Sequence, residues 1–341
     1  MKSIVRIHTQ MYAYVTLVML GDNYAKGAMV LAQTLRDVNS KYPLWCMVTE
    51  DVSAQARLGL SCVFDKIVEV PLISKSSKKL RTAKQEEIYG GWIAHSYTKW
   101  NAIDPTIMSG IDKCLFIDAD AIVRQNIDEL FEFKGPAGVF GTPWAVPFTK
   151  GASAIPNFYL DKQRNPPKHE QLITHDQIRR GLAGGFVADA SLVLLYPNRQ
   201  AFQTILRKLN TISDYGHPKC YSGSDEQLLA DMMINMTSGP YTQVYNIHQS
   251  FSCHIGKESW AAGKPIRVTQ YYNSKPWDNI VSREDLQRVL GETQWEDIAK
   301  WWEMAEKVIA NNPATEEVYF PGVREGAAEM SAASFLADIL G

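Results

Sequence analysis

The chain has 341 residues, of which 45% are hydrophobic and 21% are charged, so it is long enough for one large α/β domain or two ordinary ones. A formal net charge of −2 excludes the strong positive field typical of nucleic-acid-binding proteins. The five cysteines are scattered without a Cys-x-x-Cys pair, which predicts reduced thiols in a cytoplasmic compartment and neither a disulfide framework nor a zinc site.

The most apolar stretch near the N-terminus, residues 11–21, is too short to span a bilayer. Lys2 and Arg6 precede it, as in a secretory signal peptide. No small-residue cleavage site follows, however, and Asp22-Asn23 is typical of a turn between a strand and a helix. We therefore predict a cytoplasmic protein that retains this segment and has no membrane span.

The first part of the chain alternates between two hydrophobic periodicities. β-Branched and aromatic residues predict strands over residues 12–20, 44–49 and 66–70, and apolar residues at helical spacing predict helices over 24–38 and 53–60, the second capped by Ser53. Such alternation predicts a parallel sheet with helices on both faces. A further helix begins at Ser96 and ends at Asp104-Pro105, and Asn126 caps a short helix over 127–131.

Two carboxylates follow a short apolar run in this pattern. Residues Cys114 to Ile117 are typical of a strand buried on both faces, and Asp118 and Asp120 come directly after it. Buried carboxylates are unfavourable without a partner, and ligands of open α/β sheets bind at the carboxyl ends of the strands. Because Mg²⁺ and Mn²⁺ prefer such hard oxygen ligands, the pattern indicates a divalent-cation site.

The second half of the chain is less regular. Residues 142–180 contain five prolines among aromatic residues, which predicts a long binding loop. We expect a strand over 186–196, helices over 199–209 and from Ser224 with that serine as its cap, and a last core strand over 267–272. Two tail helices follow, over 282–290 and 295–309. The tryptophan-rich face of the second would pack on the core or on a second copy, so a homodimer is one expectation.

Taken together, several of these stretches resemble glycosyltransferase family 8, the group that contains glycogenin and bacterial galactosyltransferases. The matching segments occur in the family's order and cover about residues 12–277: Tyr24–Leu31, Tyr97-Thr-Lys99, Asp118-Ala-Asp120, Asn126–Phe131, Ser224-Asp-Glu226 and Lys275-Pro-Trp277. Trp144, the Asp225-Glu226 pair and the tail are closer to the glycogenin-like proteins of large DNA viruses and microbial eukaryotes than to animal glycogenin.

The resemblance implies a GT-A fold, with a Rossmann-like, mostly parallel central sheet and helices on both faces. Residues 1–280 would form a single glycosyltransferase domain, 142–180 its acceptor-side insert and 281–341 a helical C-terminal extension. The family also implies a metal-dependent, retaining transfer from a UDP-sugar to a glycan, protein or small-molecule acceptor, with Mn²⁺ or Mg²⁺ as cofactor. Nucleic acid is not an expected partner.

Carried over by motif, the nucleotide would contact residues from several segments. Thr16 and Leu17 would face the uracil, Tyr24 would stack on it, and the backbone at Ala119 would meet the ribose. Lys99 and Lys275 would add positive charge near the diphosphate, where a poorly solvated site strengthens its effect.

The metal and the sugar would depend on a second set of residues, namely Asp118, Asp120 and Gln270 for the metal, and Asp225, Asp189 and Lys99 for catalysis. Two of them depart from the family. Asp189-Ala-Ser191 stands where the family has Asn-Ser-Gly, and Gln270 stands near the place of a histidine ligand. A glutamine carbonyl can bind Mn²⁺ or Mg²⁺, and His248 or His254 could replace it.

Two other functions remain open on these residues. The first is a nucleotide-sugar-binding protein without transfer activity, which would explain why Asp189 and Gln270 depart from the family pattern. A phosphatase of the haloacid-dehalogenase type also has Asp-x-Asp after a strand, but Ile122 stands where that motif needs threonine, and the motif lies far from the N-terminus.

Overall fold

The computed structural model describes residues 10–78, 83, 86–87, 90–140, 168–184, 188–215, 223–248, 251, 253–254, 266–271, 275–292 and 296–321. Over these residues the chain forms an eight-stranded sheet in the order β3-β2-β1-β4-β8-β6-β9-β7. Its strands are β1 Tyr12–Val18, β2 Leu44–Val48, β3 Lys66–Glu69, β4 Lys113–Ile117, β6 Ala137–Phe140, β7 Leu172–Ile173, β8 Ala188–Leu195 and β9 Val244–Asn246. Strands β1 to β4 are mutually parallel, as the alternating pattern predicts, whereas β8 runs antiparallel to both β4 and β6.

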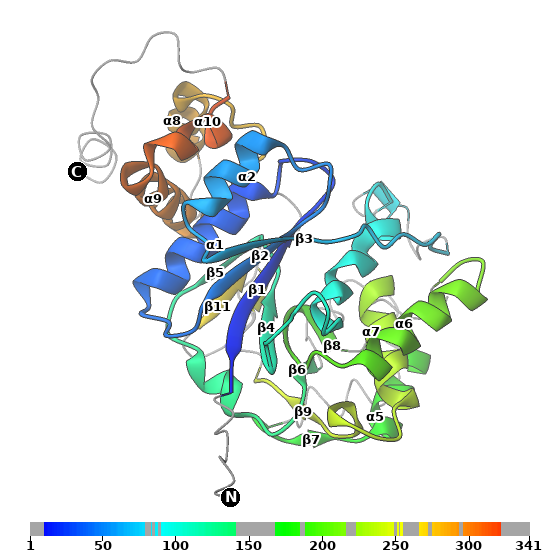
Figure 1. Cartoon of the computed structure of the whole chain (residues 1–341). Coiled ribbons are helices and arrows are strands. Elements are labelled where there is room, and N and C mark those ends of the chain that lie inside the picture. The colour runs from blue at the N-terminus through cyan, green and yellow to red at the C-terminus, as the bar shows by residue number, and fades with distance from the viewer. Residues whose placement is uncertain are drawn as a thin grey trace, which may run out of the picture.

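Helices cover both faces of this sheet (Figure 1). On one face lie α1 Ala25–Asp37, α2 Ala54–Ser61 and the tail helices, and on the other lie the 3₁₀ helix η1 Ile93–Ile103 and the helices α5 His175–Gly184, α6 Arg199–Thr211 and α7 Ser224–Asn235. A hydrophobic core lies on each face of the sheet. Strand β1 contributes to both cores because its successive side chains point to opposite faces. Tyr14 and Val18 pack towards α1, whereas Ala13, Val15 and Leu17 pack towards η1 and α7.

A second sheet lies beside the end of β4. It consists of β10 Cys253–His254, β11 Val268–Gln270 and β5 Ala121–Val123, and β11 pairs antiparallel with β5 so that Gln270 lies opposite Ala121. The strand expected over 267–272 is present as the buried β11, and Val268 packs in the main core, but the strand pairs within this smaller sheet and not within the central one. The Asp118-Ala-Asp120 segment connects the two sheets, which places it at the junction of β4 and β5.

Local structure agrees with the sequence where capping side chains are present. The Ser53 hydroxyl accepts a hydrogen bond from the Ala56 N–H, as expected of the cap of α2. The 3₁₀ helix η2 Asp128–Glu132 instead has Ile127 at its cap position, and Asn126, one residue earlier, accepts a hydrogen bond from the Asp128 N–H. The cap predicted at Ser224 is wrong, since Gly223 occupies that position and the Glu226 carboxylate binds its N–H. The helix expected from Ser96 begins at Ile93 and is a 3₁₀ helix.

The proline-rich insert is only partly covered by the described residues. Residues 141–167 lie outside them, and so does most of the predicted binding loop. Its C-terminal end is regular, contrary to expectation, because β7 pairs with β9 and α5 packs against α7. These contacts join residues more than 40 positions apart along the chain, which is why local periodicity did not indicate them.

The tail packs against the main domain of the same chain. Helix α8 Arg283–Glu292 is followed by α9 Glu296–Asn311 and the short α10 Glu316–Tyr319, and α9 lies along α1 (Figure 1). Trp301 and Trp302 are 0% and 1% exposed, and their rings contact Trp277 and Phe320. The tryptophan face is therefore covered within one copy, while Trp295 lies outside the described residues and a homodimer stays a prediction. No helix among the described residues is long and apolar enough to cross a membrane.

The two buried indoles of α9 differ in one hydrogen bond. Trp302 donates its N–H to the Pro276 carbonyl at 2.8 Å, whereas the Trp301 N–H has no acceptor among the described residues. We expect Trp302→Phe to lower the free energy of unfolding by about 1–3 kcal/mol, because a buried carbonyl loses its partner. Trp301→Phe, the matched control, removes an unsatisfied donor and should cost clearly less. Urea unfolding measures both, and equal losses would contradict the prediction.

Candidate functional site

The two carboxylates after β4 are held by backbone hydrogen bonds to both sheets. The N–H of Asp118 donates to the Ser191 carbonyl of β8 at 2.9 Å, and the carbonyl of Asp120 accepts from the Tyr271 N–H at 2.8 Å. Asp118 is 24% exposed at its side chain and Asp120 is 5% exposed overall. Strand β4 and these hydrogen bonds thus leave the Asp118 carboxylate partly exposed and the Asp120 carboxylate buried.

Lys99 joins this segment to helix α7. Its Nζ lies 3.2 Å from Asp118 Oδ1 and 2.9 Å from Asp225 Oδ2, and the residue is 8% exposed. Burial opposes the charge on the amine, but Asp118 and Asp225 overcome this and raise the pKa of Lys99. Lys99 therefore places a permanent positive charge between a residue of the metal motif and one of the predicted catalytic residues.

Lys275 supplies the second positive charge from the segment after β11. Its Nζ lies 2.6 Å from Asp120 Oδ2 and 2.8 Å from the Tyr271 carbonyl. Burial again opposes protonation, whereas Asp120 raises the pKa of Lys275. The ring of Tyr24 lies 5.8 Å from this ammonium, and burial raises the pKa of its phenol to about 12. Tyr24 is thus neutral at physiological pH and lies at the Lys275 side of the site.

Gln270 completes the set of oxygen donors at the metal motif. Its amide nitrogen is 3.3 Å from Asp118 Oδ2 and 3.2 Å from Asp120 Oδ1, while its Oε1 is buried with no hydrogen-bond partner among the described residues. Rotating the amide by 180° would turn this oxygen towards both carboxylates, and oxygen and nitrogen of a glutamine amide are nearly equivalent in shape. Two carboxylates and one amide oxygen fit a hard divalent cation.

The two histidines weighed as alternative ligands lie in different places. Within the described ranges, no three His, Cys, Asp or Glu side chains are grouped so as to hold a metal ion. His248 follows β9, where its backbone N–H donates to His169 Nδ1 at 3.2 Å. His254 is in register with Gln270 on the neighbouring strand, although its side chain lies outside the described residues.

Negative charge is in excess at the site. The carboxyl groups of Asp189 and Glu226 adjoin those described above, which makes five carboxyl groups facing the two ammonium groups of Lys99 and Lys275. The pKa of Asp118 is raised to about 7, first by burial and then by the charges of Asp120, Asp225 and Asp189, while Lys99 opposes them. An excess of buried negative charge favours the binding of a cation.

The residues expected at the base and ribose lie at the same end of the sheet. Thr16 is 1% exposed on the face of β1 towards α1, and its hydroxyl has no partner among the described residues. Leu17 and Ala119 are 8% and 4% exposed. The structure therefore gathers the predicted nucleotide residues around the carboxyl ends of β1 and β4, and their contacts with a nucleotide stay a prediction.

Gly27 is a residue of this site that sequence reasoning missed. A Cβ atom there would lie 2.6 Å from the Trp277 ring and still closer to the Ala119 carbonyl oxygen. Helix α1 can thus approach the metal motif only because this position has no side chain. The available signal was a glycine inside a strongly periodic helix, where it costs about 0.5–1 kcal/mol relative to alanine. Glu226 was also missed as a contributor, although the motif that contains it was identified.

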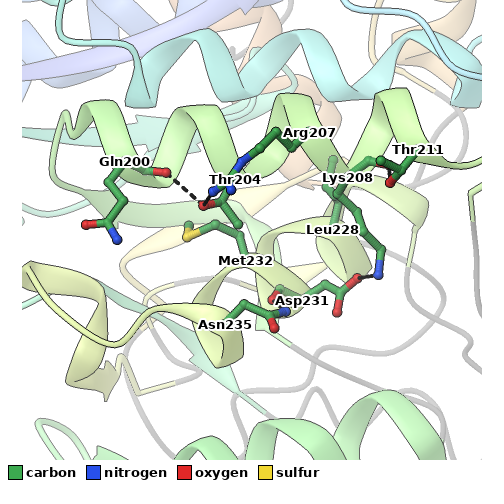
Figure 2. A pocket seen from close by; sticks show the side chains of 9 residues that line it. All are labelled: Gln200, Thr204, Arg207, Lys208, Thr211, Leu228, Asp231, Met232 and Asn235. Atoms are coloured by element: carbon green, nitrogen blue, oxygen red, sulfur yellow. Dashed lines mark hydrogen bonds and ion pairs between the residues drawn. The ribbon is translucent and has the colours of Figure 1, made fainter.

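A separate pocket of about 400 Å³ lies between α6 and α7 (Figure 2). Its wall includes Lys208 and Asp231, which form an ion pair at 2.9 Å, and Arg207, which donates to the Thr204 hydroxyl. None of the residues predicted for metal, nucleotide or sugar lines this pocket. The predicted site therefore lies elsewhere, at the ends of β1 and β4.

Comparisons with known proteins bear on the family and the fold of this chain. The model of the family described as Glycosyl transferase family 8 matches residues 15–145. An uncharacterized protein of Acanthamoeba polyphaga mimivirus is 24% identical over 81% of this chain and 85% of its own length. Human glycogenin-1 is 34% identical over 41% of this chain, but the match spans only 37% of glycogenin-1. Galactinol synthase 2 of Arabidopsis thaliana is 24% identical over 86% of this chain and 80% of its own length.

Among solved structures, an active-site mutant of LgtC superimposes with a TM-score of 0.53. The alignment covers 87% of this chain and 96% of that one, at 14% sequence identity. Such a likeness concerns the fold alone, and it extends over nearly the whole of the solved chain.

Proposed function

Because the chain belongs to the glycogenin-like proteins of glycosyltransferase family 8 and has a GT-A fold, we propose that it is a metal-dependent retaining glycosyltransferase with a UDP-sugar donor. The observation that supports the proposal most is the convergence of Asp118, Asp120 and Gln270 beside two ammonium groups. The sugar acceptor would be a glycan, a protein or a small molecule.

Transfer from a nucleotide-sugar separates negative charge onto the departing diphosphate. A divalent cation held by Asp118, Asp120 and Gln270, Mn²⁺ or Mg²⁺, would neutralise that charge. Lys275 lies on the Asp120 side of this set, and its ammonium is fixed by two hydrogen bonds. A positive charge that is already oriented stabilises developing negative charge without reorganisation during the reaction.

The sugar would lie on the other side of the metal motif, towards β8 and α7. Asp225 and Asp189 are 4% and 7% exposed there, and each has a carboxyl group that can accept hydrogen bonds from sugar hydroxyls. Lys99 fixes Asp225 relative to Asp118 through its two ion pairs. This arrangement would orient the sugar while its bond to the diphosphate breaks.

The experiment that tests the proposal is a screen of UDP- and GDP-sugars for hydrolysis with and without Mn²⁺. We expect at least one UDP-sugar to be hydrolysed only with the metal present, because water can replace the missing acceptor. Calorimetric titration of UDP with the same protein gives an independent measure of donor binding. A protein that neither binds UDP with Mn²⁺ nor hydrolyses any UDP-sugar would refute the proposal.

The second candidate is a protein that binds a UDP-sugar without transferring it. Two residues favour it, since Asp189 and Gln270 differ from the family pattern at the sugar and the metal. This candidate predicts Mn²⁺-dependent UDP binding in the calorimeter together with no turnover of any donor. The family match favours a glycosyltransferase over the phosphatase alternative.

A further inference from the structure

Glu226 makes two backbone hydrogen bonds to different elements. Its Oε2 accepts from the N–H of Gly223 at 2.7 Å, the residue directly before α7. Its Oε1 accepts from the N–H of Ala190 at 3.1 Å, within β8. The side chain therefore joins the start of the helix that carries Asp225 to the strand that carries Asp189.

The Ala190 N–H is available to Glu226 because β8 contains a bulge. Strand β6 pairs Gly138 with Val193 and the next residue, Val139, with Asp189, so residues 190–192 of β8 have no counterpart on β6. Bulges re-aim residues next to active sites and leave backbone groups unpaired in the ladder. The same segment binds the metal motif, since the Ser191 carbonyl accepts from the Asp118 N–H.

We propose that Glu226 is a positioning residue of the transfer reaction, which holds the bulge of β8 against the start of α7 and so fixes Asp189 relative to Asp225. The inference rests on the proposed function, because it assigns a role within the same site. Glu226 acts on both aspartates through backbone hydrogen bonds, from Gly223 before α7 and from Ala190 in β8. Asp225 is fixed from α7 by Lys99 as well, whereas the Asp189 carboxylate binds the N–H of Ser191 in the bulge itself.

Burial and the charges around Glu226 disfavour its ionised form. Burial raises the pKa of Glu226 well above its ordinary value, Asp189 and Asp225 raise it further, and the Ala190 N–H and Lys99 oppose them. A protonated carboxyl group can still accept at both oxygens and donates its proton as well. Neutral Glu226 would thus keep both backbone hydrogen bonds and add no third negative charge beside the two aspartates.

Charged side chains on the helices α5 and α6, which pack against α7, form ion pairs with residues other than Glu226. In α5, Asp176 and Arg180 are exposed and form an ion pair with each other. In α6, Lys208 pairs with Asp231, which lies farther along α7. Among the described residues, the charged groups with the main effects on the pKa of Glu226 are Asp189 of β8, Asp225 of α7 and Lys99 of η1.

Glu226→Gln and Glu226→Ala separate the contributions of this side chain. Glutamine keeps one acceptor oxygen and presents an NH₂ group that cannot accept, so one of the two backbone N–H groups loses its partner. Alanine removes both hydrogen bonds. Glu306→Gln is the matched control, because Glu306 is 1% exposed and paired with Arg283 in the tail.

We expect Glu226→Gln to lower turnover of the best UDP-sugar about tenfold or more at saturating donor, with Mn²⁺-dependent UDP affinity within about twofold of the wild type. Wild-type turnover should fall as the pH rises through the pKa of Glu226, where the neutral acid is lost. This alkaline decline should be absent in the glutamine variant, since an amide does not ionise. Wild-type turnover and pH profile in Glu226→Gln, or an equal loss in Glu306→Gln, would overturn the inference.

Hydrogen exchange tests the same residue without any turnover. In Glu226→Ala, the amides of Gly223 and Ala190 should exchange faster than in the wild type while exchange in the tail helices is unchanged. Unchanged exchange at both amides would overturn the inference even if the enzyme is active. A wild-type protein that turns over no UDP-sugar would instead refute the proposed function, and with it the catalytic half of the inference.

Discussion

The Asp118→Asn protein is expected to fold and to lose metal-dependent turnover of the UDP-sugar by about a thousandfold or more. Asparagine has nearly the same shape as aspartate, but its neutral oxygen is a much weaker ligand for a divalent cation. Asp118 is also the better position to change than Asp120. Lys99 keeps Asp225 as an ion-pair partner, whereas Asp120 is the carboxylate that pairs with Lys275.

Turnover and metal affinity measured on the same sample check this expectation. Hydrolysis of the best UDP-sugar should be titrated with Mn²⁺ for the wild type and Asp118→Asn, and circular dichroism should confirm that both are folded. Asp176→Asn is the matched control, because Asp176 is 68% exposed and its only described ion pair is on the surface. An Asp118→Asn protein with wild-type turnover at the same Mn²⁺ concentration would rule out the metal site.

Gly27→Ala is expected to reduce turnover about a hundredfold and to lower the free energy of unfolding by about 1–3 kcal/mol. The new methyl group would lie 2.6 Å from the Trp277 ring and would overlap the Ala119 carbonyl oxygen. Neither neighbour can move freely. Trp277 is 2% exposed and donates to the Asn23 side chain, and Ala119 lies between the two carboxylates of the metal motif.

Gly291→Ala provides the control for this substitution. Gly291 lies in α8, and a Cβ atom there would have no other atom within 4 Å. Alanine should therefore stabilise the protein by about 0.5–1 kcal/mol through helix propensity and leave turnover unchanged. Chemical unfolding and the UDP-sugar assay report on both variants. If Gly27→Ala were as stable and active as Gly291→Ala, the close approach of α1 to the metal motif would be wrong.

The elements that the sequence predicted well are those with a complete local signal. Strands β1, β2 and β4 and helices α1 and α2 each begin and end within two residues of their predicted bounds. Each has enough residues to show a period, and Ser53 accepts the backbone hydrogen bond expected of the cap of α2. The carboxylates at the end of β4 could be recognised for the same reason.

Other parts of the fold have no such signal. Strands β5, β6 and β9 have three or four residues each, too few to show alternation, and they exist because distant partners satisfy their backbone groups. The 3₁₀ geometry of η1 is equally invisible in its apolar pattern. Gly223 as the cap of α7 depends on Glu226, and a serine beside it was the more obvious candidate.

The sequence by itself determined the strand that ends in Asp118 and Asp120, the alternation that makes the sheet parallel around it, and the motifs that include Lys99, Asp225 and Lys275. Only the tertiary structure decided that Gln270, 150 residues farther along, donates to Asp120, that Gly27 must lack a side chain, and that Glu226 joins α7 to β8. The physical reason is the distance along the chain over which each kind of interaction acts. Periodicity and capping act within a few residues, whereas the burial of charge and the contact of backbones are settled only when separate segments pack together.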